Sequence, residues 1–251
     1  MSDHLAECLA LVRRHDHDRF LSTLFAPDEV RGALLALYAF NVEVTRIRDV
    51  VSEPSLGLIR LQWWRDTVEG LYAGGSGAGH PVAEALDGAI MAGGLPKQAL
   101  LDLITAHEFD LYQDRMPDVT ALEAYLGETS SRLIQMAALI LDKAGALKAS
   151  EAAGLAGVAQ GLVSILGDPR HRGPFLPESM DVTAAIAHAR KRLGQARALL
   201  PSLPKSVLPA FLPMSLTETD LKQIAKAPDA ALSVSPLKRQ LLMWWTARRW
   251  G

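Results

Sequence analysis

The chain has little cysteine, few aromatic residues and almost no net charge, and each shortage excludes a class of protein. Its one cysteine, Cys8, forms neither an internal disulfide nor a cysteine metal cluster, and it fits a reducing compartment. The formal net charge of −2 gives no electrostatic reason to expect a nucleic-acid partner. The best apolar run, 133–141, is far shorter than the roughly 20 residues of a transmembrane helix. The first 20 residues lack the apolar region of a signal peptide. We therefore expect a soluble, cytoplasmic protein.

The composition favours helices. The 251 residues include 37 Ala and 40 Leu, the two most frequent strong helix formers, while aromatic residues make up only 6%. Segments rich in alternating valine and isoleucine are absent. With 49% hydrophobic and 22% charged residues, the chain has enough apolar surface for a large core. The sequence predicts an all-α fold.

Start and stop signals divide the chain into helices. A long helix is expected from Asp28 to about 51, and Ser52-Glu53-Pro54 restarts a second one with Ser52 as N-cap. Thr120 with Glu123 has the spacing of a capping box. The helix that this box begins is expected to end near 145, and further helices are expected from about 150 and from 236. Because no repeat or linker interrupts this series, we predict a single domain, 1–251.

The motifs of the best-known enzyme classes are missing. The chain has no nucleophile elbow, phosphate-binding loop, dinucleotide fingerprint or zinc-protease motif. One segment that interrupts the apolar pattern is 38–49, where Asn41, Thr45, Arg46, Arg48 and Asp49 lie in an otherwise apolar helix. This set is either a functional cluster or the solvent-exposed stripe of an amphipathic helix.

A second unusual segment is 154–168. Small residues recur at Gly154, Gly157, Gly161 and Ser164, and Asp168 follows at the expected helix end. Such a pattern permits either close approach of another helix or room for a ligand. Both interpretations stay open at this stage.

Both segments carry a resemblance to a known family. LLALYAF (34–40), GVAQGLVSILGD (157–168) and RGPFLP (172–177) resemble the squalene/phytoene synthase family. AFNVE (39–43), IRLQWW (59–64) and PAFLPMSL (209–216) are most similar to a subgroup that includes a mitochondrial complex I assembly factor. The resemblance implies an isoprenoid synthase-like helical domain around a central cavity, with a core at about 18–180 and C-terminal helices at 181–251.

The resemblance also implies a chemistry. Enzymes of this family join two prenyl diphosphates with Mg²⁺ held by two aspartate-rich motifs, since leaving diphosphate needs divalent charge and hard cations need carboxylate oxygens. In the first motif, which begins at Tyr38 and includes Asn41, the three acid positions correspond to Thr45, Arg46 and Asp49. The second motif corresponds to a segment that contains Gly161, Ser164 and Asp168.

Only two of the acids are therefore left as metal ligands, Asp49 and Asp168. Arg46 places positive charge where the family has a carboxylate, and at about 5 Å its repulsion with a divalent ion is roughly 6–7 kcal/mol at an effective dielectric near 20. We expect no cofactor and a non-condensing protein that binds a partner protein, or a prenyl-type lipid or diphosphate. The alternative is an active prenyl-diphosphate transferase with unusual Mg²⁺ ligation.

The apolar positions of the family scaffold persist even though most acids do not. We expect the central cavity to be lined by six of them: Phe40, Val44, Leu133, Met136, Leu162 and Ile165.

The last segment, SPLKRQLLMWWTARRWG, combines tryptophan with basic residues. Trp244, Trp245 and Trp250 lie close to Arg248 and Arg249, and Lys238 and Arg239 precede them. This composition suits either peripheral contact with a membrane, here the inner membrane, or a partner groove. The equally weighted alternative is that the tryptophans pack on the core of the domain. An exposed binding surface and a packed helix therefore both stay open.

Overall fold

The computed structural model describes residues 3–77, 79–112, 114–169, 172–232 and 235–250, and all regular structure in these ranges is helical. The predicted all-α fold is confirmed. Contacts between Cα atoms divide the chain into two compact units. Unit 1 comprises residues 1–112 and 136–144, and unit 2 comprises 113–135 and 145–251.

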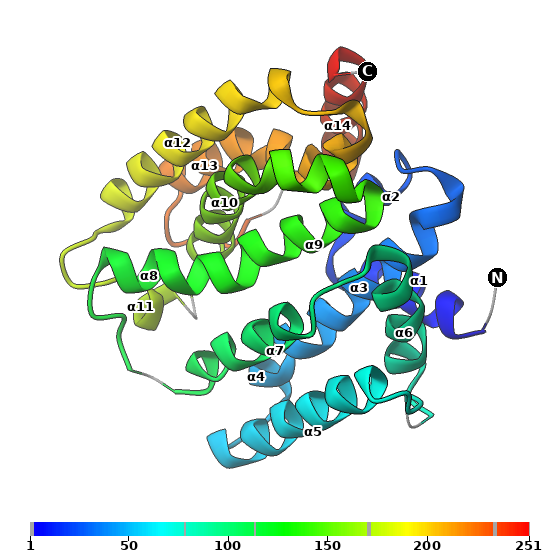
Figure 1. Ribbon diagram of the computed structural model, residues 1–251. Coiled ribbons are helices and arrows are strands. Elements are labelled where there is room, and N and C mark those ends of the chain that lie inside the picture. Colours follow the sequence, from blue (N-terminus) through cyan, green and yellow to red (C-terminus); the bar gives the residue numbers. More distant parts are fainter. Residues whose placement is uncertain (1–2, 78, 113, 170–171, 233–234, 251) are drawn as a thin grey trace. The chain divides into compact units, whose positions relative to one another are not determined.

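Unit 1 is built around a buried helix, α3 (Asp28–Thr45). It contacts both α1 (Asp3–His15) and α6 (Pro81–Gly93), which also contact each other (Figure 1). Ten of the eleven residues from Leu34 to Val44 are buried, because this apolar run has neighbours on more than one side. The short helices α2 (His17–Thr23) and α4 (Ile47–Val50) flank α3. Thus α3 positions the first predicted motif within the core of unit 1.

Most of the remaining elements of unit 1 pack around α5. Helix α5 (Pro54–Tyr72) packs against α7 (Lys97–Ala106) and the 3₁₀ turn η1 (Phe109–Leu111). The restart at Pro54 is confirmed, with Pro54 in the first turn, but the N-cap is Glu53 rather than Ser52. The C-terminal part of α9 (Arg132–Leu141) also belongs to unit 1.

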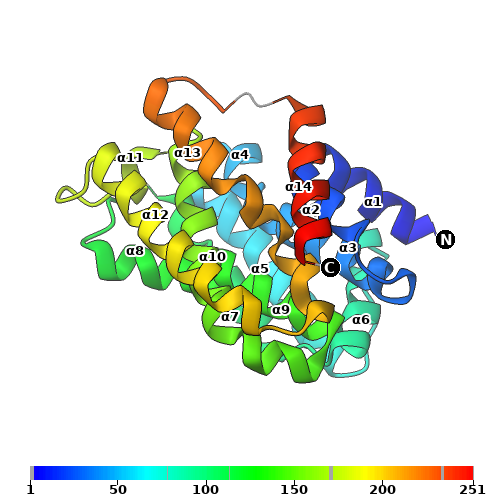
Figure 2. The ribbon, with the colours of Figure 1, turned by 90° about the horizontal axis from the view of Figure 1, so that it is seen from above.

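Unit 2 contains the longest helix, α10 (Lys143–Leu166), most of which lies in this unit. Before it come α8 (Val119–Leu126) and a π-helical turn, η2 (Gly127–Ser131). After it come α11 (Arg172–Phe175), α12 (Val182–Leu199) and two 3₁₀ segments, η3 (Leu200–Ser202) and η4 (Lys205–Leu216). The unit ends with α13 (Thr217–Lys226) and α14 (Pro236–Trp250), and both pack against η4 (Figure 2).

Two predicted helix starts in unit 2 are wrong. The cap of α8 is Asp118, whose carboxylate accepts from the backbone N–H of Ala121 at 2.8 Å. Thr120 therefore does not begin the helix, and the carboxylate of Glu123 is bound elsewhere, to His188 and Arg192. Helix α10 begins at Lys143 rather than near 150, because the Asp142 carboxylate accepts from the N–H of Ala144 at 3.0 Å.

Helix α10 also has the length and composition of a membrane-spanning helix, although 61% of its most apolar 18-residue window is buried within the protein. A buried core helix has these same properties, so the helix is weak support for a membrane span. The sequence did not predict a membrane-spanning helix here, because Ser150, Glu151 and Gln160 interrupt the apolar residues of α10.

Candidate functional site

The first predicted motif lies where α3 ends. Thr45 is the last residue of α3, and Arg46 separates it from α4, so the expected helix to residue 51 is interrupted at Arg46. The Thr45 hydroxyl donates to the carbonyl oxygens of Asn41 (2.9 Å) and Val42 (3.2 Å) of its own helix. Thr45 thus contributes a neutral hydroxyl turned towards the backbone, at a position where the resemblance implies a carboxylate.

The acid that persists in this motif, Asp49, lies in α4 with its side chain 46% exposed. Its Oδ1 lies 3.8 Å from Nε of Arg48. The guanidinium of Arg48 also lies 4.0 Å from a second carboxylate, that of Asp110. Asp110 is 4% exposed and is hydrogen-bonded to Nδ1 of the buried His107 at 2.7 Å. This buried acid–imidazole pair was not among the predicted site residues.

The predicted small residues of α10 pack against another part of unit 2. A Cβ added to Gly157 would lie 2.2 Å from the Cα of Ser131, and one added to Gly161 would lie 2.4 Å from Leu126 Cδ2. The Ser131 hydroxyl also donates to the carbonyl of Gly154 at 2.8 Å. Of the two interpretations left open, close approach of another segment is therefore the one that the structure bears out at Gly157 and Gly161.

The two other members of the second motif differ in exposure. Ser164 is exposed on α10, and Asp168 is half-buried two residues after the helix ends at Leu166. Asp168 belongs to unit 2, whereas Asp49 belongs to unit 1. Within the described part of the chain, no group of three or more His, Cys, Asp and Glu side chains is arranged to hold a metal ion.

The apolar positions predicted to line a cavity are divided between the two units. Phe40, Val44 and Met136 are buried in unit 1, and Leu133 and Leu162 are buried in unit 2, where Ile165 is half-buried. Tyr38, at the start of the first motif, is also buried, and burial raises its pKa to about 12. Its ring lies 5.9 Å from the guanidinium carbon of Arg19.

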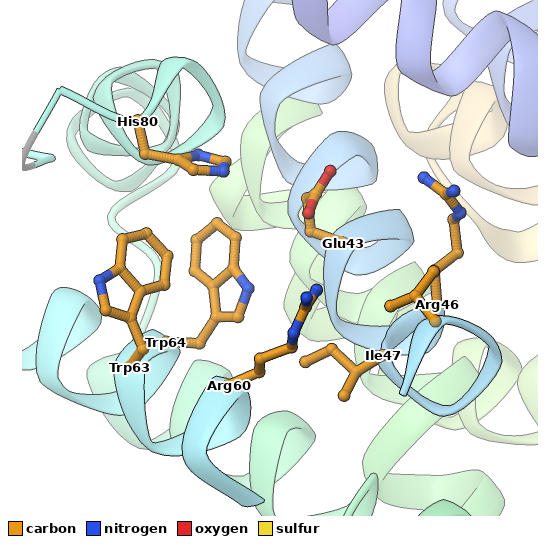
Figure 3. Close-up of a pocket in the computed structure, with 8 residues that line it drawn as sticks. Glu43, Arg46, Ile47, Arg60, Trp63, Trp64 and His80 are labelled. Atoms are coloured by element: carbon orange, nitrogen blue, oxygen red, sulfur yellow. The ribbon is translucent and has the colours of Figure 1, made fainter. Parts of the chain in front are cut away.

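Unit 1 contains a pocket of about 350 Å³ beside the first motif (Figure 3). Its walls come from three places: the end of α3 with α4, the first half of α5, and the residue before α6. The lining residues are Glu43, Arg46, Ile47, Val50, Arg60, Trp63, Trp64 and His80. Of the predicted site residues, Arg46 is the one that this pocket includes.

One wall of the pocket is a cluster of three rings. Trp63 and Trp64 meet edge to face with ring centroids 4.9 Å apart, and the His80 ring lies 5.2 Å and 5.3 Å from them. Trp64 also packs edge to face on Phe40 at 5.3 Å, which ties this wall to α3. Because Trp64 is buried and Trp63 is 38% exposed, the cluster extends from the core to the surface.

The charged groups of the pocket form no ion pair with the residues that the structure describes. Glu43, Arg46 and Arg60 form no salt bridge or side-chain hydrogen bond with any described residue. Figure 3 shows the carboxylate of Glu43 with Arg60 extending towards it from α5 and Arg46 on its other side. Burial lowers the pKa of nearby His15, and the positive charge of Arg46 lowers it further. The pocket is therefore lined by two arginines and one glutamate that form no ion pair within the described part of the chain.

His80 contributes a polar ring to the same space. Its Nδ1 is buried without a hydrogen-bond partner among the described residues. A buried N–H without an acceptor is rarer than an unpaired lone pair, so Nε2 is the ring nitrogen expected to carry a proton. Figure 3 shows the tip of the ring pointing towards Glu43. Sequence reasoning noted IRLQWW only as a family likeness, yet Arg60, Trp63 and Trp64 share a helix face by their spacing.

The C-terminal helix presents a second surface, on unit 2. Trp244 is 42% and Trp245 is 61% exposed, and Leu237 and Leu241 are exposed on the same helix. The alternative in which both tryptophans pack on the core is therefore wrong; Met243 is the residue of α14 that is buried. Arg248 lies over the Trp244 ring at 4.6 Å and, like Arg249, is exposed, whereas Trp250 is half-buried. Arg239 instead turns inward to Asp220.

Comparisons with known proteins identify the family of this all-helical chain. Residues 12–172 match the squalene/phytoene synthase family, and the chain belongs to that family. It is 34% identical over 243 residues to NADH dehydrogenase (ubiquinone) complex I, assembly factor 6, from Bos taurus, covering 86% of this chain and 72% of that protein. The protein of the same name from Homo sapiens is 33% identical, with coverage of 90% and 74%.

A solved structure supports the fold independently. A dehydrosqualene synthase determined in complex with a ligand superposes with a TM-score of 0.76 at 14% identity, covering 98% of this chain and 96% of that chain. The isoprenoid synthase-like fold expected from the resemblance is therefore confirmed. The chain thus has an isoprenoid synthase-like fold, whereas the bovine and human relatives described above are named as assembly factors.

Proposed function

We propose that this chain is a non-condensing member of its family, which acts by binding a partner protein or a lipid rather than by joining prenyl diphosphates. The observation that carries the proposal is the state of the first acid-rich motif. Thr45 directs its hydroxyl at the backbone of α3, and Arg46 lines a pocket as a cation. Neither residue offers Mg²⁺ the carboxylate oxygens that it prefers.

The names of the relatives support an assembly role. The bovine and human proteins are named as assembly factors of the NADH dehydrogenase (ubiquinone) complex I. By this analogy, the chain acts on a respiratory NADH dehydrogenase from the cytoplasmic side of the inner membrane. Such a role requires surfaces for binding and no metal cluster.

The exposed face of α14 supports contact with the membrane. Tryptophan rings favour the headgroup region, and each Lys or Arg near an anionic surface adds about 1 kcal/mol of attraction. Lys238, Arg248 and Arg249 are exposed, whereas Arg239 is held by Asp220. The proposed contact is therefore peripheral, reversible and sensitive to salt.

Incubation of the purified protein with farnesyl or geranylgeranyl diphosphate and Mg²⁺ tests the absence of condensation. We expect neither release of inorganic diphosphate nor a squalene- or phytoene-type product. A product that the full-length protein forms, and that Asp49→Asn or Asp168→Asn abolishes, would establish the alternative, an active transferase with unusual Mg²⁺ ligation.

The assembly role is tested in the native host. Deletion of the gene should lower NADH:ubiquinone oxidoreductase activity in isolated membranes while leaving the squalene and carotenoid content unchanged. Complementation with the Asp49→Asn variant should restore the activity, because the proposed role does not use a metal ligand at this position. Loss of an isoprenoid with normal NADH oxidation would contradict the proposal.

A further inference from the structure

The pocket of unit 1 has a composition that selects for one kind of ligand. Its two arginines and one glutamate carry a net charge of +1 and form no ion pair with any described residue. A cavity of about 350 Å³ accommodates a small molecule or a headgroup, at the lower end of the range for ligand sites. A ligand with one net negative charge and at least one hydrogen-bond donor complements this set of charges.

The rim of the pocket adds an apolar requirement. Val50 and Trp63 line the pocket and are 49% and 38% exposed. Leu56 and Ile59, on the exposed side of α5, are 47% and 66% exposed, and Ile59 lies one helical turn before Trp63. Exposed apolar side chains beside a charged pocket suit an amphiphile, whose chains contact the rim while its head enters the pocket.

We propose that this pocket binds the head of a monoanionic phosphodiester lipid that carries hydroxyl groups, as phosphatidylglycerol does. The phosphate is bound by the guanidinium of Arg60, with Arg46 adding positive charge, and the Nε2–H of His80 is a further donor. A lipid hydroxyl donates to the carboxylate of Glu43. The acyl chains extend over Trp63, Val50 and the outer side of α5. The proposal deepens the proposed function by naming the lipid class of one site.

The net charge of the pocket and the carboxylate of Glu43 distinguish this lipid from two chemically similar lipids. Phosphatidylmethanol has the same net charge but no hydroxyl to donate to Glu43, so that carboxylate would stay without a donor beside the bound head. Phosphatidylethanolamine has a donor but no net charge, so it matches the charge of +1 less well. We therefore expect affinity to fall from phosphatidylglycerol to either of the other two.

Calorimetric titration with dioctanoyl lipids below their micellar concentration tests the site. Full-length protein should bind dioctanoyl-phosphatidylglycerol saturably and at least several-fold more tightly than dioctanoyl-phosphatidylmethanol. Arg60→Gln should weaken binding about tenfold or more, because a hydrogen bond to a charged group is lost. Glu43→Ala, which leaves no acceptor for the lipid hydroxyl, should abolish the preference for phosphatidylglycerol. Lys97→Gln, an exposed cation of α7 outside the pocket, is the matched control and should bind as the unmodified protein does.

Tryptophan fluorescence locates the ligand independently of the charged variants. Trp63→Phe should reduce the emission change on binding, and Trp245→Phe, in α14, should leave it intact. If Arg60→Gln fails to fold by circular dichroism, Arg60→Lys and this fluorescence pair decide the outcome. Absence of saturable binding, or binding that is unaffected by Arg60→Gln and Trp63→Phe, would overturn the proposal.

Vesicles distinguish a lipid taken from the bilayer from one bound free. If the site takes lipid from the membrane, Arg60→Gln should weaken co-sedimentation with vesicles that contain phosphatidylglycerol, and by more than with vesicles of phosphatidylmethanol, which the unmodified site binds less tightly. Binding of the free lipid without an effect of Arg60→Gln on co-sedimentation would assign the site to free lipid. Neither result depends on the condensation assay, so a product there would overturn the proposed function and leave this site standing.

Discussion

Arg239 and Asp220 join α14 to α13 through two parallel hydrogen bonds, of 2.8 Å from Nη1 to Oδ1 and 3.0 Å from Nη2 to Oδ2. The two side chains are 17% and 5% exposed, so the pair is largely withdrawn from water. Together with the buried Met243, it attaches the C-terminal helix to unit 2. The face of α14 with Trp244 and Trp245 is therefore held outward.

Breaking this pair should destabilise unit 2. Arg239→Ala leaves the Asp220 carboxylate largely buried without its bidentate partner, and we expect the free energy of unfolding to fall by about 3 kcal/mol. Lys238→Ala, an exposed neighbour on the same helix, should change it by less than about 0.5 kcal/mol. Urea denaturation followed by circular dichroism measures both. Equal stability of the two variants would show that the pair does not hold α14.

A second charged group links α8 to α12 and makes stability depend on pH. The Glu123 carboxylate accepts from His188 Nε2 (2.6 Å) and from Arg192 Nε (2.6 Å) and Nη2 (2.8 Å). Burial by itself raises the pKa of Glu123, but these hydrogen bonds and charges outweigh it and lower the pKa from its usual 4.5.

Because the pKa is lower in the folded protein, this stabilisation is present above about pH 4.5 and is lost as the pH falls through the folded value. Glu123→Gln should therefore lower the free energy of unfolding at pH 7 by about 1 kcal/mol and change it much less at pH 3. Denaturation curves between pH 3 and pH 7 check this. A loss that is independent of pH would mean that the variant acts through packing and not through charge.

The sequence predicted the class of fold because helix formers are spread along the whole chain and because the family scaffold of apolar residues is kept. It did not predict how Glu123 is used, since its partners lie 65 and 69 residues further along the chain. The predicted capping box was a local pattern that these distant partners override. Asp118, which does cap α8, lies two residues before the Thr120 that was chosen.

The pocket was predictable only in part. Arg46 stood out as a cation at an acid position, but the other walls come from α5 and from the residue before α6. Only the packing of these helices brings His80 to Trp63 and Trp64. Whether Arg46 has an ion-pair partner is likewise decided by the fold, since Glu43, three residues away, does not pair with it.

The close packing at α10 is tested by matched glycine substitutions. In Gly157→Ala the new Cβ would lie 2.2 Å from the Ser131 Cα, so backbone must move, and we expect a loss of about 1–3 kcal/mol in the free energy of unfolding. Gly154→Ala meets nothing within 4 Å and replaces a poor helix former. It should be neutral or stabilising by up to about 1 kcal/mol. Thermal melts rank the two variants, and Gly157→Ala as stable as Gly154→Ala would exclude close packing as the reason for the glycine.

The contact of α14 with membranes is best tested by substitution, because deletion of residues 236–251 also removes the buried Met243 and the bond from Arg239 to Asp220. Trp245→Ala removes a ring that is 61% exposed, so the free energy of unfolding should change by less than about 0.5 kcal/mol. Co-sedimentation with anionic vesicles at low salt should fall several-fold, because the ring no longer enters the headgroup region.

Leu147→Ala is the matched control, since Leu147 is 80% exposed in unit 2 but lies on α10. It should leave co-sedimentation unchanged. Arg248→Gln should weaken co-sedimentation at low salt and have little effect at high salt, because screening already removes its contribution there. Vesicle binding that survives Trp245→Ala and Arg248→Gln together would assign the exposed face of α14 to a partner protein, since a bilayer would sense both the missing ring and the missing charge.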